Sequence, residues 1–188
     1  MTTVDQADEA ANKALPVFYF EDFRPGQIAT SGSVTITEAD IIRFATEFDP
    51  QPMHTDPHVA QTITNGLIAS GWHTASVTMR LLITGRGYRP APGTLGLGFE
   101  NLRWHQPVRP GDSLHLQIEL LTTRASESKP DRGIITSRFT TFNQRNEVVQ
   151  SMTSSAIVPR RPPFNHGHGL NPPNGPDQHQ SPPPSARR

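Results

Sequence analysis

The chain has 188 residues, no cysteine, and 17 basic side chains against 17 acidic ones. It therefore forms neither disulfides nor cysteine-ligated metal sites, and it lacks the net basic field that attracts nucleic acid or an anionic membrane surface. No apolar run approaches a membrane-spanning length and no signal-peptide pattern is present, so we expect a cytoplasmic protein that binds neither nucleic acid nor a membrane.

Two end segments differ from the rest of the chain. Residues 1–15 are small, polar and acidic without a sustained apolar period, which predicts a flexible N-terminal arm. Residues 159–188 contain nine of the 19 prolines, four arginines and few apolar side chains, so they cannot bury enough surface to offset the entropy of ordering. We expect a disordered Pro-rich basic tail there, and a single domain over residues 16–158.

The first elements of this domain place an acid at a helix exit. The β-branched run 27–36 predicts a strand, and Thr37 with Asp40 forms a capping box that starts a helix. An apolar stripe then follows at helical spacing, formed by Ile41, Ile42, Ala45 and Phe48. Pro50 ends this helix because the residue before a proline is disfavoured in the helical region, so Asp49 lies at the exit.

A stiff segment and a long helix come next. Pro50, Pro52 and Pro57 restrict the backbone around Asp49 and His54, and Asp56-Pro57 starts a short helix through Ala60. Ser70 then caps a longer helix that Gly71 opens and Gly85 ends. Hardly any polar face remains on it, as expected for a helix wrapped on most sides by other elements.

Beyond Gly93 the apolar period changes to two, which is the period of strands. Strands are predicted from Leu95 to Trp104, from Leu114 to Leu120, from Ile134 to Phe142 and from Val148 to Val158. Short turns join the last three, which implies an antiparallel meander. The predicted fold class is α+β, with a curved antiparallel sheet wrapped around one central helix.

The run FDPQPMHTDPHVA resembles the hydratase signature of the MaoC-like dehydratases and (R)-specific enoyl-CoA hydratases, which have the hot-dog fold. The corresponding places are occupied by Asp49, Pro52, Met53, His54 and Ala60. LIASGWHTAS is similar to the family's entry into its central helix, and HQPVRPGD to its turn before a long outer strand. The resemblance covers about residues 18–158.

Three positions depart from the family pattern. Phe48 stands where the family usually has Gly, Gln51 where it usually has Asn, and Ser70 where many members have His. Gln51 keeps an amide at its place. These differences bear on acyl-group specificity more than on the reaction.

Asp49 and His54 are the predicted catalytic residues. Hydration of an enoyl thioester needs a group that takes a proton from water, and an acid and a histidine on one stiff loop can both contact a single water. We expect Asp49 to act as the base, with His54 orienting the water and shuttling protons. Free N–H groups near Gly71, at the helix start, would stabilise the enolate-like oxygen. Ser70 as helix cap, and Ser76 as a small residue able to contact Asp49 or His54, complete the expected substrate-binding set.

Structural roles compete with these assignments. Asp49 could simply end a helix, and His54 could be a structural hydrogen-bonding residue. The spacing of His54, Asp56 and His58 fits a metal site, but Pro57 intervenes and no third strong ligand is evident, so we expect no metal. No separate cofactor is expected, because coenzyme A is part of the substrate.

Three functions remain open at this level. The first is an enoyl-CoA hydratase or acyl dehydratase acting on an acyl-CoA thioester. The second is a hot-dog acyl-CoA thioesterase, and the third is a non-catalytic acyl-binding subunit. The resemblance also implies a homodimer or a dimer of dimers, and pairing would cover an exposed sheet edge. Candidates for binding the phosphates of coenzyme A are Arg86, Arg89, Arg103 and Arg109.

Overall fold

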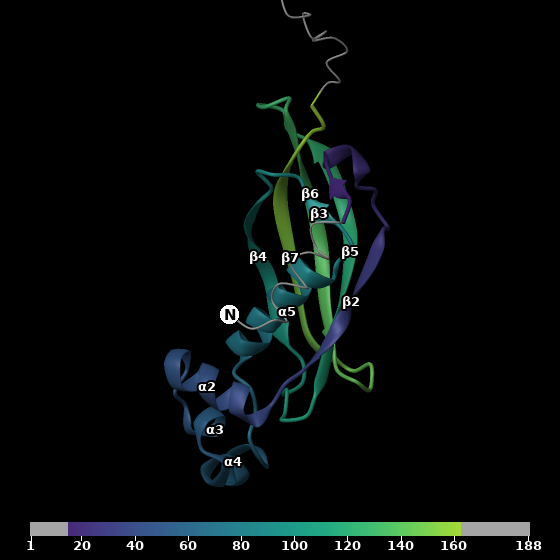
Figure 1. Cartoon of the computed structure of the whole chain (residues 1–188). Helices are drawn as coiled ribbons and strands as arrows, with labels where there is room; N and C mark the ends of the chain where they lie inside the picture. Colours follow the sequence, from purple (N-terminus) through teal and green to yellow (C-terminus); the bar gives the residue numbers. More distant parts are fainter. Residues whose placement is uncertain (1–14, 163–188) are drawn as a thin grey trace, which may run out of the picture.

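A five-stranded antiparallel sheet and one long helix dominate the computed structural model, which describes residues 15–162 (Figure 1). The strand order is β2-β5-β6-β7-β4. The strands are β2 (Ile28–Thr35), β4 (Leu95–Trp104), β5 (Ser113–Ala125), β6 (Arg132–Phe142) and β7 (Val148–Pro159). The predicted strands and the β5-β6-β7 meander are therefore confirmed.

The core forms where the inward face of the sheet meets the helices. Alternate residues of β5 are buried as the period of two predicts, and they are joined by Phe139 of β6 and Val149 and Met152 of β7. Full burial of such an aliphatic side chain stabilises the fold by about 1.5–3 kcal/mol. The sheet is thus held to the helices mainly by apolar contact, which fixes the face that each strand presents.

Three helices gather at one end of the sheet, beside the start of the long helix (Figure 1). Helix α2 (Glu38–Phe48) begins with the predicted capping box, in which the Asp40 N–H donates to Thr37 Oγ1 at 3.1 Å. The short helix α3 (Pro52–Thr55) was not predicted, because four residues are too few to show a period. Helix α4 (Pro57–Thr64) runs four residues beyond the predicted end at Ala60, and Asp56 caps it as expected.

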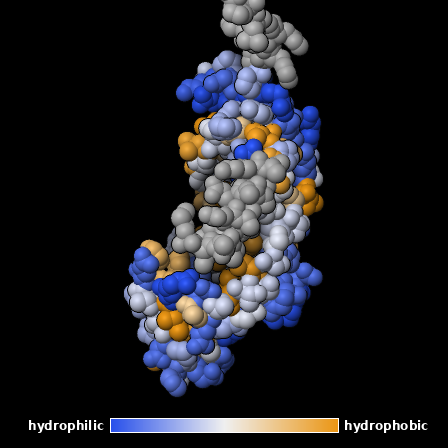
Figure 2. Space-filling model, in the orientation of Figure 1, coloured by the Kyte–Doolittle hydropathy of each residue, from blue (hydrophilic) through white to orange (hydrophobic). Residues whose placement is uncertain are grey.

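The long helix α5 (Gly71–Gly85) matches its predicted limits but is covered on one side only. Its buried residues are His73, Thr74, Thr78 and Leu81. Trp72 and Ile83, on other faces, are exposed. The expectation of a helix wrapped on most sides is therefore wrong for a single chain, because the sheet and α2 reach only one face. Figure 2 shows hydrophobic residues bordering the middle of one face of the molecule, whereas its two ends are mostly hydrophilic.

A second, smaller core lies at the far end of α5. Strand β1 (Val17–Phe18) pairs in parallel with β3 (Arg89–Pro90), and the 3-10 helix η1 (Phe20–Asp22) follows β1. The Phe18 and Tyr88 rings stack at 4.3 Å between centroids. This core closes the end of the sheet that α2–α4 leave uncovered.

The predicted arm and tail lie almost wholly outside the described residues. Strand β7 continues to Pro159, one residue into the expected tail. Arg161 donates to the Asp22 carboxylate at 2.7 Å, so the first residues after β7 are attached to η1. The part of the chain that the structure describes contains no helix long and apolar enough to cross a membrane.

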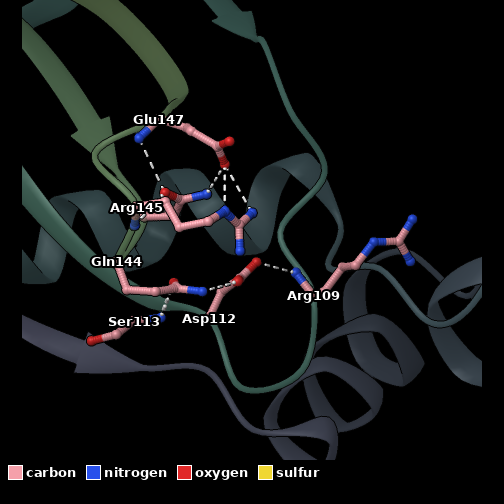
Figure 3. Close-up of polar contacts among 7 residues, drawn as sticks. Arg109, Asp112, Ser113, Gln144, Arg145 and Glu147 are labelled. Carbon is pink, nitrogen blue, oxygen red and sulfur yellow. Dashed lines mark hydrogen bonds and ion pairs between the residues drawn. The ribbon is translucent and has the colours of Figure 1, made fainter.

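A polar cluster joins two turns at the end of the sheet near α2–α4 (Figure 3). The buried Asp112 carboxylate accepts from the Arg109 backbone N–H at 2.8 Å and from the Gln144 amide at 2.9 Å. The Gln144 side-chain oxygen in turn accepts from the Ser113 N–H at 3.0 Å. The β4–β5 turn is thereby fixed to the β6–β7 turn.

We expect Asp112→Ala to lower the free energy of unfolding by about 1–3 kcal/mol, because it leaves a backbone N–H and a side-chain amide without their acceptor. Urea unfolding followed by circular dichroism measures this. Asp131→Ala is the control: its carboxylate is exposed and pairs only with the neighbouring Arg132, so the unfolding curve should hardly move. Equal stability of the Asp112 variant and the wild type would contradict the assignment.

Candidate active site

Asp49 is the residue that directly follows α2, at the helix exit as predicted. Its N–H donates to the Ala45 carbonyl at 2.9 Å, which holds the residue at the helix exit. Its Oδ1 accepts from the Gln51 amide at 2.7 Å, and its Oδ2 accepts from the Ser70 hydroxyl at 2.6 Å. The carboxylate is thus fixed by one neighbour along the chain and by one residue from the start of α5.

These donors set the charge of the Asp49 carboxylate. The hydrogen bond from Ser70, and after it the one from Gln51, holds the pKa of Asp49 below its usual value, because both bonds stabilise the ionised form. The side chain keeps 19% of its surface exposed. Asp49 is therefore an ionised, accessible carboxylate at neutral pH, which is the state that a general base requires.

His54 comes from α3, and its side chain is only 8% exposed. Its Nδ1 lies 2.8 Å from the Ile68 carbonyl oxygen, which can only accept, so Nδ1 carries the proton of this bond. Nε2 then points to the acid and lies 3.6 Å from Asp49 Oδ2. This distance is too long for a direct hydrogen bond, but one oxygen atom can contact both groups at once.

Ser70 connects the acid to the first turn of α5. Its Oγ donates to Asp49 and accepts from the Trp72 backbone N–H at 3.2 Å, so one hydroxyl both caps the helix and orients the carboxylate. The Gly71 N–H beside it has no acceptor among the residues described. Asp49 and the helix start, which the sequence analysis treated as the two halves of a site, are therefore in contact.

Gly71 is required by close packing rather than by an unusual backbone conformation. A Cβ added at this position would lie 2.4 Å from Cε2 of the Trp104 indole, a distance that real Cβ atoms do not reach. Trp104 is held in turn by its Nε1–H, which donates to Gln150 Oε1 at 2.9 Å. The tryptophan therefore packs directly on the helix start.

A buried polar chain extends this support across the sheet. Gln150 on β7 donates its amide to Thr78 Oγ1 at 3.0 Å, and Thr78 on α5 shares a 2.7 Å hydrogen bond with Thr141 on β6. Gln150, Thr78 and Thr141 are all fully buried. These residues were not predicted, because β7 carries several other polar side chains and nothing local distinguishes Gln150 among them.

A cavity of about 260 Å³ lies against the helix start. His54 and Gly71 both line it, so the histidine of the dyad and the free helix amide face one space. Its other walls come from Thr74 on α5 and from the β4–β5 segment, including Trp104 and His105. The cavity can thus receive a small group between the proton-transfer residues and the positive end of α5.

Ser76 is not brought to this group. It is exposed on α5, and its hydroxyl donates to the Trp72 carbonyl at 2.9 Å. Six residues after Ser70, at about 100° per residue, a side chain lies well around the helix from the capping serine. Within the described residues Ser76 therefore does not contact Asp49 or His54, and its place in the substrate-binding set stays a prediction.

His73 is buried on the side of α5 that faces α2. Its ring stacks on Phe44 with centroids 4.8 Å apart, and its Nδ1 has no hydrogen-bond partner among the described residues. Burial lowers the pKa of His73, so the ring is neutral at physiological pH. The residue packs against α2, the helix that Asp49 follows.

The four arginines considered for coenzyme A binding differ in their surroundings. The Arg109 side chain points away from Asp112 (Figure 3), and its guanidinium donates to the Thr64, Asn65 and Gly66 carbonyls at the end of α4. Arg109 thus caps a helix. Arg89 donates to the Leu15 carbonyl at 3.3 Å, and Arg86 is partly buried and lies 5.3 Å from the Tyr88 ring centroid. Arg103, on β4, is exposed and has no side-chain hydrogen bond within residues 15–162.

Within residues 15–162, no group of three or more His, Asp or Glu side chains could hold a metal ion. His58 lies on α4, and its backbone N–H donates to Asp56 at 2.8 Å as part of the helix cap. The Asp56 carboxylate is therefore the N-cap of α4.

Comparisons with known proteins identify the family of this chain. Residues 24–141 match the model of the MaoC like domain. An (R)-specific enoyl-CoA hydratase from Rhodospirillum rubrum is 30% identical over 154 residues, which cover 78% of this chain and 96% of that protein. The crystal structure of a MaoC-like dehydratase from Rhodospirillum rubrum superposes with a TM-score of 0.73 at 46% identity, covering 77% of this chain and 99% of the other.

The fold is shared more widely than the sequence. A conserved hypothetical protein from Mycobacterium tuberculosis with a double hotdog fold matches at a TM-score of 0.64 and 21% identity, over 80% of this chain and 46% of the other. The antiparallel sheet and its packed helix are thus the hot-dog fold that the sequence predicted. The matched family model and the covered relatives together show that the chain belongs to the MaoC-like domain family.

Proposed function

We propose that the protein is a hydratase or dehydratase that interconverts a trans-2-enoyl thioester and the corresponding (R)-3-hydroxyacyl thioester. One observation carries the proposal. The Asp49 carboxylate is hydrogen-bonded to Ser70, the residue that immediately precedes Gly71, and His54 lies 3.6 Å from the same carboxylate oxygen. Proton transfer and oxyanion stabilisation are therefore available at one place. The hydratase and dehydratase names of the relatives support the same reaction class.

The proposed mechanism uses the two acceptor atoms of the dyad. A water placed between Asp49 Oδ2 and His54 Nε2 donates one hydrogen bond to each. Its oxygen attacks Cβ while Asp49 takes its proton, and the π electrons move toward the thioester oxygen. The proton is then delivered to Cα by way of His54, so that the elements of water are added overall. The Ile68 carbonyl holds the histidine in the tautomer that this exchange needs.

The developing negative charge on the thioester oxygen is assigned to the start of α5. The Gly71 N–H is a donor whose capacity is not used within the described residues, and the helix dipole favours an anion there. The proposed mechanism needs no cofactor, because coenzyme A is part of the substrate. We propose a cytoplasmic location for the protein.

We also propose that the active protein is a homodimer or a dimer of dimers. Strand β4 is an edge of the sheet, and its Leu95, Leu97 and Phe99 are 62%, 53% and 49% exposed. An exposed apolar edge strand invites pairing with another chain. Trp72 and Trp104 lie beside this edge, with ring centroids 5.7 Å apart, and both are exposed. A second copy on β4 would thus lie next to the cavity.

We expect the wild-type protein to hydrate crotonyl-CoA, with loss of the conjugated-thioester absorbance and no release of thiol. Asp49→Asn should lower the rate by about 10²–10⁴, because the amide cannot take the proton. Asp56→Asn is the matched control: it changes a carboxylate on the same segment, and asparagine caps a helix as well as aspartate does. Thiol release would show a thioesterase, and an inert wild type would favour a non-catalytic subunit.

The Ser70 hydroxyl gives a test that depends on pH. Ser70→Ala removes the main cause of the lowered pKa of Asp49, so that pKa should rise. A base with a higher pKa becomes ionised only at higher pH, and the acidic limb of the kcat/KM profile should therefore move upward in pH. Ser70→Thr, which keeps the hydroxyl, should restore the original limb. A limb that does not move in the alanine variant would separate Ser70 from the base.

Disruption of the β4 edge tests the assembly. Leu97→Glu places a charge on the exposed edge strand, so we expect sedimentation velocity to show a species of half the wild-type mass or less. Thr122→Glu, at an exposed position on the inner strand β5, should leave the mass unchanged. A wild-type protein that sediments as a monomer would overturn the proposed assembly.

A further inference from the structure

Two adjoining cavities lie along α5, on the side of Gly85 rather than of Asp49. One, of about 240 Å³, runs beside Met79, Leu82 and Ile83 of α5 and reaches Phe99 on β4. The other, of about 250 Å³, opens between β2 and the aromatic residues Phe18 and Phe23. Together they reach the roughly 300–1,000 Å³ that small-molecule sites occupy.

Both cavities meet at Arg86. Five residues line the two spaces in common: Phe23, Arg86, Tyr88, Ile118 and Ser137. Arg86 is the one charged residue among those that line the two cavities, and neither cavity is lined by an Asp or a Glu. The walls are otherwise mainly aromatic and aliphatic, and the polar exceptions are two serines, one threonine and one glutamine, besides the Tyr88 hydroxyl.

The Arg86 guanidinium is only partly used by the protein. Its Nε donates to the Tyr88 carbonyl at 3.1 Å, and the group lies 5.3 Å from the centroid of the Tyr88 ring. Its Nη1 and Nη2 groups have no acceptor within the described residues, and Arg86 forms no ion pair there. Burial lowers the pKa of Arg86, yet an arginine stays protonated at neutral pH.

Arg86 is partly buried, a partly desolvated cation without an anion is costly, and a carboxylate bound to it offsets part of that cost. A planar guanidinium with two free amino groups also matches a carboxylate in a two-pronged hydrogen bond. The apolar walls on both sides match a hydrocarbon chain. The ligand chemistry that satisfies both features is an unbranched apolar chain that ends in a carboxylate.

We propose that this double cavity binds a medium-length aliphatic chain with its terminal carboxylate on Arg86. Two sources supply such a group: a free fatty acid, or the far end of an acyl thioester whose chain carries a second carboxylate. The second source rests on the proposed hydratase function, whereas the binding itself does not. Arg86 lies 15 positions after Gly71, which corresponds to a rise of about 22 Å along the helix axis.

The binding test compares decanoate with decanol by isothermal titration calorimetry on the full chain. Decanoate should bind the wild type, and decanol, with the same chain but no charge, should bind at least about tenfold more weakly. Arg86→Met should remove this difference, and Arg86→Lys should retain part of it. Arg80→Met is the matched control, since Arg80 is exposed on the same helix and lines neither cavity. Thermal unfolding of each variant checks that the second core remains folded.

Equal affinity for decanoate and decanol in the wild type would overturn the proposal, and so would an undiminished preference in a folded Arg86→Met protein. A kinetic comparison identifies the source of the carboxylate. If it belongs to the substrate, trans-2-decenedioyl-CoA should be hydrated faster than trans-2-decenoyl-CoA, and Arg86→Met should abolish the preference. If only calorimetry responds to Arg86→Met, the ligand is a free fatty acid. Absence of turnover with both thioesters would count against the hydratase function and leave the calorimetric result standing.

Discussion

The hydrogen bond between Ser70 and Asp49 is the contact on which the site depends. It joins the residue that follows α2 to the residue that caps α5, across 21 positions of sequence. It fixes the carboxylate directly against the helix start. Because the same hydroxyl accepts from the Trp72 N–H, the geometry of the helix cap and the orientation of the acid cannot change independently. The capping of α5 therefore also determines the orientation of the proposed catalytic carboxylate.

Residues far from the dyad support this contact from the other side. Trp104 packs on Gly71, Gln150 holds the indole, and Thr78 and Thr141 satisfy the remaining polar atoms of Gln150 and of each other. Each of these side chains has at least one hydrogen-bond partner, so the buried network adds rigidity to the helix start. The helix start is therefore fixed between a carboxylate on one side and a sheet-anchored aromatic ring on the other.

The local elements of this fold follow from short-range signals in the sequence. Thr37 with Asp40, Asp56 with Pro57, and Ser70 with Gly71 each mark a helix start that the structure contains, and the alternation along β5 specifies its buried face. The motif placed Asp49 and His54 on one segment, and the structure brings them close.

Other features depend on distant parts of the chain and left no local signal. The Trp104–Gln150 bond spans 46 residues, and neither side chain shows a period or motif that points to the other. Ser76 was misplaced because spacing along a sequence does not reveal which face of a helix meets a loop. The one-sided burial of α5 was missed because an apolar composition does not distinguish a face covered by the same chain from one that is left exposed.

The approach of the Trp104 indole to Gly71 has a consequence for how the family can vary. The ring fills the volume that a side chain at position 71 would need, so the two positions share one fixed space. A related sequence with alanine at position 71 needs a smaller side chain than tryptophan at position 104. It would then lack the indole N–H that donates to the glutamine at position 150. Positions 71, 104 and 150 are therefore expected to change together among related sequences, although they lie on a helix and two different strands.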